Sequence, residues 1–308
     1  MKKNILISII CLLVFLNVNG QSHSINDSIK KTSFVDSNLL KHIKILSSDA
    51  FEGRRTETNG GEKAKIYIIN QFMATSVLPL TKGYQQTFSF NSEGKHYNGV
   101  NVLGLIKGSL YPENYIVISA HYDHEGSKKG QIYNGADDNA SGVSALFSFA
   151  EYFINNPPKH SVILAAFDAE ELGLQGSKYF VSHSIIPSKQ IMVNLNMDMI
   201  SRSDKKELFA VGTAHNETLK KVIMNYTYSK KINLLTGHDE GNWKDNWTDA
   251  SDHASFHKKG IPFLYFGVDD HEDYHEPTDD YENIQPEFYI EAVKVIIGVF
   301  EKIDVLTF

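Results

Sequence analysis

Cysteine is almost absent from this sequence of 308 residues, which contains only Cys11. That residue lies within the apolar stretch near the start, so loss of the stretch would leave no thiol. Disulfide bridges, thiolate metal sites and cysteine nucleophiles are therefore excluded for the rest of the chain. About 290 residues would remain, which is enough to bury a core without disulfides, and we expect one domain.

Long apolar runs are also scarce, and the one that stands out is Ile5–Val18, preceded by Lys2 and Lys3. A positive start followed by a short apolar run is typical of a secretory signal peptide, and this run is too short to span a bilayer comfortably. We expect a signal peptide over 1–20, a polar segment over 21–37 and a folded domain over 38–308. The expected location is periplasmic or extracellular, with no membrane attachment after cleavage; an uncleaved anchor is the alternative.

Basic residues are outnumbered, 30 against 37 acidic ones. Without Lys2 and Lys3 the balance is 28 against 37, a net charge of −9, so we expect no nucleic-acid partner. Some of the acidity could belong to metal-binding carboxylates, which bound cations would neutralise. Phosphate-binding glycine loops and a Gly-x-Ser-x-Gly elbow are both missing, which argues against nucleotide binding and a serine nucleophile.

What the sequence does have is an alternation of apolar runs and helical stripes. It favours a mixed, mostly parallel α/β sheet with helices on both faces. Ligands bind at the carboxyl ends of the strands in such sheets. The predicted strands are 97–106, 115–120, 161–167, 191–197 and 261–268, and the predicted helices are 39–46, 60–73, 143–153, 172–181 and 288–300.

Histidines and carboxylates follow four of these strands. Alone, each cluster could be a helix cap or a solvated loop. Together at one sheet edge the carboxylates would repel each other unless cations neutralised them. Imidazole and carboxylate ligands suit zinc, with manganese or cobalt as alternatives. The clusters are 121–124, 168–171, Asp198 and 269–280, and a fifth, 135–142, opens a helix.

These motifs resemble, in family order, those of the bacterial co-catalytic zinc aminopeptidases, which are zinc exopeptidases related to glutamate carboxypeptidase and the glutaminyl cyclases. The resemblance extends from about Leu39 to the C-terminus. It implies the single-domain zinc-exopeptidase fold, also called phosphorylase/hydrolase-like. The motifs are HYDHEG at 121–126, GADDNASG at 135–142, FDAEELGLQGS at 167–177, NMDM at 196–199, SDHASF at 251–256 and YHEPTDDYENI at 274–284.

The resemblance also implies a pair of zinc ions that share one carboxylate and one water. His121 and Asp198 would bind one ion, Glu171 and His275 would bind the other, and Asp137 would bridge them. Removal of N-terminal residues from peptide substrates would follow from such a pair.

Three further residues receive catalytic or supporting roles from the same resemblance. Glu170 would be the general base, Asp123 would orient the His121 ring, and Tyr274 would stabilise the oxyanion. An adjacent pair of glutamates can divide the work, one binding metal and the other moving a proton. Asp252 could support His275 as Asp123 supports His121.

Several residues of suitable type are expected outside the ligand set. We predict supporting or solvated positions for His124, His253 and His271, and a loop-shaping role for Asp138. Trp243 and Trp247 belong either to a substrate-facing loop or to buried anchors of that loop.

The motifs leave other functions open. A single-zinc glutaminyl cyclase, a carboxypeptidase or a dipeptidase could use the same scaffold, because the pocket decides the substrate. A non-catalytic exported binding module is a further alternative, although none of the expected ligands is missing. We expect a monomer, and the side-chain preference is not determined by the motifs.

Overall fold

The computed structural model describes residues 34–92, 94–183, 185–239 and 246–306. The predicted signal peptide, most of the predicted polar segment and Trp243 lie outside these residues. Within the described ranges no helix has the length and apolar character needed to cross a membrane.

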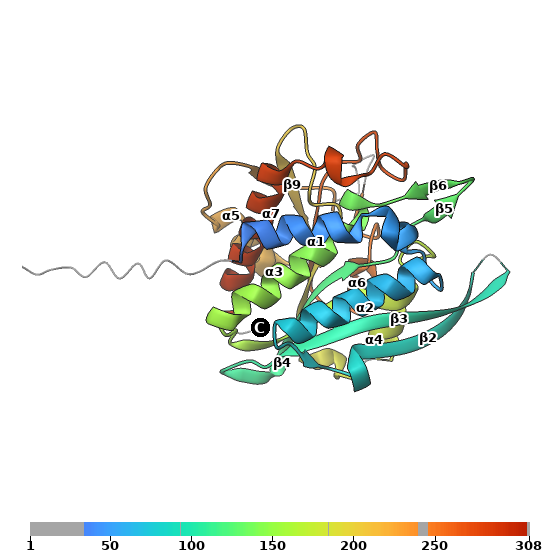
Figure 1. Ribbon diagram of the computed structural model, residues 1–308. Coiled ribbons are helices and arrows are strands. Elements are labelled where there is room, and N and C mark those ends of the chain that lie inside the picture. Colours follow the sequence, from blue (N-terminus) through green and yellow to red (C-terminus); the bar gives the residue numbers. More distant parts are fainter. Residues whose placement is uncertain (1–33, 93, 184, 240–245, 307–308) are drawn as a thin grey trace, which may run out of the picture. The chain divides into compact units, whose positions relative to one another are not determined.

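A sheet of nine strands forms the centre of the described domain (Figure 1). Its order is β1-β3-β7-β4-β8-β11-β9-β10, with β2 paired to β3. The central strands β7, β4, β8 and β11 are parallel, while β3 and β9 run antiparallel to their neighbours β7 and β11. The bounds are β1 Leu78–Pro79, β2 Gln85–Ser92, β3 Lys95–Ile106, β4 Tyr111–His121, β7 His160–Phe167, β8 Ile191–Met197, β9 Glu207–Val211, β10 Asn233–Thr236 and β11 Phe263–Gly267.

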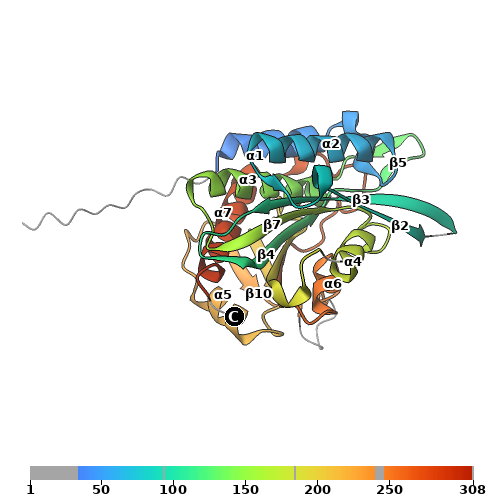
Figure 2. The ribbon, with the colours of Figure 1, turned by 90° about the horizontal axis from the view of Figure 1, so that it is seen from below.

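Helices cover both faces of this sheet, as predicted (Figure 2). One face packs against α1, α2, α3, α5 and α7, and the other against α4 and α6. Because successive side chains of a strand point to opposite faces, Ile116 and Val117 enter different cores. The bounds are α1 Asp36–Leu46, α2 Asn59–Ala74, α3 Gly142–Asn155, α4 Gln175–Ser182, α5 Glu217–Asn225, α6 His253–His257 and α7 Pro286–Ile303.

The mixed α/β fold class is thus confirmed, with differences in detail. The helix predicted over 172–181 begins at Gln175, because Leu174 has a positive φ of 57° and the residues after β7 form turns. Between the first two helices the chain forms a short 3-10 helix, Asp49–Arg54. Four strands of this sheet, β1, β2, β9 and β10, were not predicted, because their apolar patterns are short or interrupted.

Short elements complete the described chain. A hairpin of β5 and β6 lies between β4 and the turn that precedes α3. That turn has irregular backbone angles and leads directly into α3 at Gly142. The bounds are β5 Gly126–Lys128, β6 Gln131–Tyr133 and the turn η3 Ala136–Ser141, together with the 3-10 helices η2 Lys82–Tyr84, η4 Ser188–Gln190 and η5 Tyr281–Asn283.

Candidate metal centre

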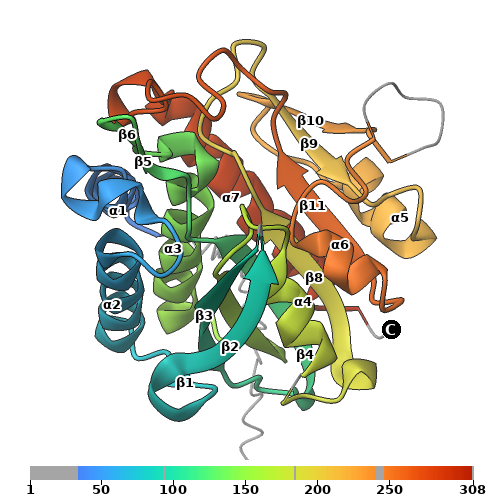
Figure 3. The same cartoon turned by 90° about the vertical axis from the view of Figure 1, so that its right-hand side faces the viewer.

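The strands β4, β8 and β11 lie side by side in the sheet (Figure 3), and most of the predicted site residues follow the carboxyl ends of the parallel strands. His121 is the last residue of β4, and β4 pairs with both β7 and β8. Glu170 and Glu171 follow β7, Asp198 follows β8, and His275 lies in the chain after β11. One edge of the sheet therefore carries all five, as the strand pattern predicts.

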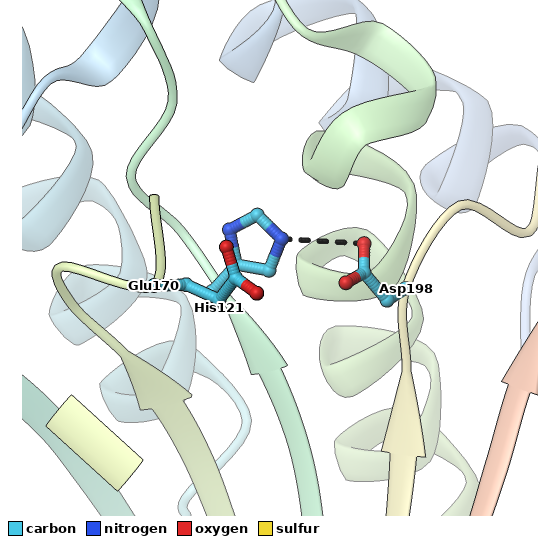
Figure 4. Close-up of side chains that lie close together, drawn as sticks. All are labelled: His121, Glu170 and Asp198. Carbon is cyan, nitrogen blue, oxygen red and sulfur yellow. Dashed lines mark hydrogen bonds and ion pairs between the residues drawn. The ribbon is translucent and has the colours of Figure 1, made fainter. Parts of the chain in front are cut away.

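The first group of ligand atoms comes from His121, Glu170 and Asp198, and these atoms all lie within 4.8 Å of one another. His121 Nε2 is 3.2 Å from Asp198 Oδ1. Figure 4 shows the imidazole ring with the carboxylate of Glu170 on one side and that of Asp198 on the other. The ring is 1% exposed, so these charges meet in a region shielded from water.

The second group comes from Asp138, Glu171 and His275. His275 Nε2 is 3.1 Å from Asp138 Oδ2 and 3.3 Å from Glu171 Oε2. The other oxygen of Asp138, Oδ1, is 3.2 Å from His121 Nε2. Asp138 therefore lies between the two groups and offers one oxygen to each.

This placement corrects the prediction for Asp137, which the structure does not bring into the cluster. Its Oδ1 accepts hydrogen bonds from the backbone N–H and the hydroxyl of Ser201, at 2.6 and 2.8 Å. Its Oδ2 is 3.0 Å from His271 Nε2. Asp138, predicted to shape the loop, lies between the two groups instead.

The local backbone explains why neighbouring aspartates diverge. Asp138 has φ −103° and ψ 96°, outside helical geometry, between residues of a turn that leads into α3. The backbone N–H groups of Asp137 and Asp138 both donate to the carboxylate of Asp279, each at 2.9 Å. Asp279 therefore fixes the turn, and the extended conformation at Asp138 sends its side chain away from that of Asp137.

His124, for which a supporting or solvated position was predicted, lies buried beside the ligand candidates and is not solvated. Its ring is fully buried, and Nδ1 is 2.8 Å from Glu171 Oε1. The other two histidines do lie outside: His271 pairs with Asp137, and His253 stacks on Tyr265 with ring centroids 4.5 Å apart.

Asp123 lies beside His121, as predicted, but its carboxylate has further partners. His121 Nδ1 is 3.1 Å from the backbone oxygen of Asp123 and 3.7 Å from Oδ1. The carboxylate accepts the backbone N–H of Glu170 at 3.0 Å and that of Glu171 at 3.3 Å. Asp123 thus joins the ends of β4 and β7 and fixes the backbone of both glutamates.

Asp252 does not support His275, contrary to the prediction. It is fully buried, and burial raises its pKa to about 7. The charges that act on it are those of His121, which lowers the pKa, and of Asp123 and Asp198, which raise it. Asp252 therefore lies on the side of the cluster that contains His121.

Arg54, to which no sequence pattern pointed, is buried beside the cluster and is 1% exposed. It donates hydrogen bonds to the backbone oxygens of Tyr122 at 3.0 Å and Gly135 at 2.8 Å, and also to those of Leu46 and Asn134. Burial lowers its pKa to about 10, a change opposed by Asp138. Arg54 therefore ties the 121–126 and 135–142 motifs together.

Asp168, the first carboxylate after β7, was likewise left without a role. It accepts the Thr56 hydroxyl at 2.8 Å and the Val100 backbone N–H at 2.9 Å. Burial and the nearby Asp123 raise its pKa to about 7. Asp168 therefore links the end of β7 to Thr56 and to β3, and it is not one of the ligand candidates.

The two neighbouring glutamates of the cluster have pKa values shifted in opposite directions. Burial lowers the pKa of His121, but Asp198 and Glu170 outweigh that effect and raise it well above the usual value. Burial and the charge of Asp198 raise the pKa of Glu170 well above its usual range. Burial alone would raise the pKa of Glu171, yet hydrogen bonds from His124 and His275 lower it to about 2.

The donor set fits zinc. Four carboxylates and three imidazoles converge, and the described lysines and arginines form no ion pair with those carboxylates. Without cations, such an excess of buried negative charge is costly. Nitrogen and oxygen donors without thiolate are typical of catalytic zinc. The carboxylates are Asp138, Glu170, Glu171 and Asp198, and the imidazoles are His121, His124 and His275. Glu125 also comes close to Glu171 and His275, but it is paired with Arg55 and Lys128.

A small cavity opens onto the cluster, with a volume of about 90 Å³. Its wall combines the ligand candidates with apolar and aromatic side chains, among them Trp247, Tyr265 and Val268. Tyr274 also lines it, with its ring stacked on His275 at a centroid distance of 4.0 Å. Tyr274 and Trp247 thus border the space that a substrate would enter.

Comparison with known proteins gives consistent matches. The sequence model of peptidase family M28 matches residues 101–300. Aminopeptidase YwaD of Bacillus subtilis is 32% identical over 197 residues, which cover 61% of this chain and 41% of that protein. The chain spans less than half the length of the curated relatives it matches.

Solved structures show the same fold at low identity. A Zn-dependent exopeptidase from Parabacteroides distasonis has a TM-score of 0.69 at 17% identity, covering 87% of this chain and 97% of its own. A glutaminyl cyclase from Porphyromonas gingivalis has a TM-score of 0.71 at 14% identity, covering 88% of this chain and 99% of its own. At such identities the likeness concerns the fold alone.

Proposed function

The chain belongs to peptidase family M28, and we propose that it is a zinc-dependent aminopeptidase that removes N-terminal residues from peptides. The family predicted from the motifs is confirmed by this membership. The single observation that carries the proposal is the position of Asp138, whose two oxygens lie 3.2 Å from His121 Nε2 and 3.1 Å from His275 Nε2.

That position supports a pair of ions sharing one carboxylate. His121 and Asp198 would hold one zinc and Glu171 and His275 the other, with Asp138 common to both. When bound, zinc lowers the pKa of water and polarises a carbonyl group. Manganese and cobalt accept the same donors, so metal analysis has to identify the native ion.

Glu170 is the proposed general base. Its carboxylate is close to His121 and Asp198, and Asp123 fixes its backbone N–H. In the reaction Glu170 takes a proton from the attacking water, and it then transfers that proton to the nitrogen of the departing amine.

Tyr274 and Asp123 assist in different ways. The Tyr274 side chain lines the cavity, so its hydroxyl could donate to the carbonyl oxygen as negative charge develops there. Asp123 acts through the groups it orients, because it lies against the His121 ring and accepts the backbone N–H groups of Glu170 and Glu171.

The test of this function is the Glu170→Gln variant. Glutamine keeps the size of the side chain but cannot take a proton, so kcat should fall by about 10²–10⁴ while the zinc content stays normal. Exposed Glu62, changed to Gln, is the matched control and should keep its activity. Near-normal peptidase activity in Glu170→Gln at normal zinc content would contradict the proposal.

A single-zinc glutaminyl cyclase is the principal alternative, since the fold is shared with such an enzyme. One zinc per chain in the active protein, together with cyclisation of peptides that begin with glutamine, would favour it. Two zinc ions and release of free N-terminal residues would favour the aminopeptidase.

The direction of attack on the peptide requires a substrate panel. Carboxypeptidase and dipeptidase activities can use the same metal ligands, because loops around the cavity select the substrate. Peptides blocked at either end separate the three: an aminopeptidase should cleave a C-terminally amidated peptide and leave an N-acetylated one intact.

Export and a monomeric state are also part of the proposal. Lys2, Lys3 and the apolar run Ile5–Val18 support export through a signal peptide, which would leave the folded domain over 38–308 after a short polar segment. N-terminal sequencing of protein recovered from the periplasm or medium should begin at Gln21. A cell-associated protein that still begins at Met1 would contradict export, and light scattering would test the monomer.

A further inference from the structure

His124 is the cluster residue that the proposed function leaves without a task. We propose that its Nδ1 is an additional ligand of the ion held by Asp138, Glu171 and His275. The inference rests on the proposed zinc site and adds a third imidazole to it.

The loop around His124 is built to hold its ring in place. The ring is fully buried three residues beyond the end of β4. A Cβ atom at Gly135 would lie 2.5 Å from His124 Cδ2 and 2.6 Å from Cγ, closer than real Cβ contacts. Only glycine at 135 leaves room for the imidazole, so the ring is confined between this turn and the carboxylates.

The nitrogen of His124 faces the same carboxylates as that of His275. His124 Nδ1 is 2.8 Å from Glu171 Oε1 and 3.7 Å from Asp138 Oδ2. His275 Nε2 is 3.3 Å from Glu171 Oε2 and 3.1 Å from the same Asp138 Oδ2. The two rings have their centroids 5.9 Å apart. His124 Nδ1 and His275 Nε2 therefore both face the carboxylates of Asp138 and Glu171.

These separations match the spacing of ligands around one ion. Donor atoms placed tetrahedrally at about 2.0–2.1 Å from zinc are about 3.3 Å from each other. The observed values, 2.8, 3.1, 3.3 and 3.7 Å, lie on both sides of that spacing. A hydrogen bond from His124 to Glu171 alone would account for the first value but not for the approach to Asp138.

An additional ligand makes the two ions unequal. The ion beside His124 would be held by four side chains, which is the closed arrangement typical of tightly held zinc. The ion of His121 and Asp198 would share only Asp138 with it and keep positions open for water. We therefore expect one ion to survive dialysis and the other to exchange.

The experiment uses the full chain carrying Asp198→Asn, which weakens the first ion site and leaves one zinc per chain. Into this background we add His124→Asn. The asparagine amide can still donate a hydrogen bond to Glu171, but it is a poor zinc ligand. His253→Asn is the matched control, because His253 is also buried but lies outside the cluster.

Two readouts decide, and neither depends on activity. Zinc affinity, measured by chelator competition, should fall more than about 100-fold in the double variant, beyond the 10–100-fold typical of a residue that only orients a ligand. X-ray absorption should show two imidazoles around zinc in Asp198→Asn and one after His124→Asn is added.

One imidazole in Asp198→Asn, or an affinity loss below about tenfold in the double variant, would overturn the role of His124. Absence of zinc binding by the unaltered chain would instead refute the proposed function, so the two failures are distinguishable.

Discussion

The two ends of strand β7 use the same residue types in opposite ways. At the amino end His160 Nδ1 is 3.1 Å from Asp304 Oδ1, and the oxygens of Asp304 also accept the backbone N–H groups of Lys159 and His160 at 2.7 and 2.9 Å. At the carboxyl end Glu170 and Glu171 join a cluster in which four carboxylates meet three imidazoles.

The difference lies in the balance of charge and hydrogen-bond donors. One carboxylate with one imidazole and two N–H donors is satisfied within the protein and needs nothing further. Four carboxylates with three imidazoles and no lysine or arginine pair among the described residues leave negative charge in a buried place. A buried histidine paired with one aspartate is therefore explained by its role in the fold. A buried excess of carboxylates, in contrast, indicates bound cations.

The largest effect should come from removing the carboxylate of Asp138, the proposed bridge between the two ions. Asp138→Asn should lower activity by more than about 10³ and reduce the zinc content, since the residue faces both halves of the cluster. Asp137→Asn is the matched control next door and should cost at most about 10–100-fold, because it acts through Ser201 and His271. The reverse ranking of the two variants would restore the sequence-based assignment.

A second test measures how the stability of the fold depends on pH, with and without metal at the carboxyl end of β7. In the metal-free protein Asp168 and Asp252 have pKa values raised to about 7, and that of His275 is raised to about 11. Burial raises the first two; burial opposes the third, but Asp138 and Glu171 outweigh it. The folded chain then binds more protons than the unfolded one, so its stability should fall as pH rises from about 5 to 9.

The zinc-loaded protein should show the opposite slope in the same range, because zinc competes with protons for its ligands and binds more tightly as pH rises. Glu171, whose pKa is lowered to about 2, adds stability above about pH 4.5 that is lost as pH falls toward 2. Thermal unfolding at several pH values, with zinc and after chelation, measures both slopes. Parallel slopes would mean that metal and protons do not share these groups.

The smallest effect is expected at the amino end of β7. Asp304→Asn should destabilise the fold by about 1–3 kcal/mol, because buried N–H groups lose a charged acceptor. Activity and zinc content per folded molecule should be unchanged. A large change in zinc content would show that the two ends of the strand are coupled after all.

Sequence reasoning was strongest where local pattern determines structure. The buried strands ending at His121, Phe167 and Met197 were identified from their continuous apolar character, and parallel pairing then required the following residues to meet. The site's location and most of its members follow from that argument.

It failed where tertiary backbone geometry decides between chemically identical neighbours. Asp137 and Asp138 differ only in which way an irregular turn directs them, and the turn is set by Asp279, more than a hundred residues away. The role of Arg54 could not be predicted for a related reason. Its partners are backbone oxygens of separate loops, and every residue has a backbone oxygen, so no sequence pattern identifies such partners.

The central claim is a pair of metal ions that makes the excess of carboxylates functional. The most direct test is to strip the protein of metal and measure release of N-terminal residues while zinc is returned in known equivalents. We predict no activity without metal and activity that reaches its maximum at two zinc ions per chain. Full activity in the metal-free protein, or a maximum at one ion, would contradict the account.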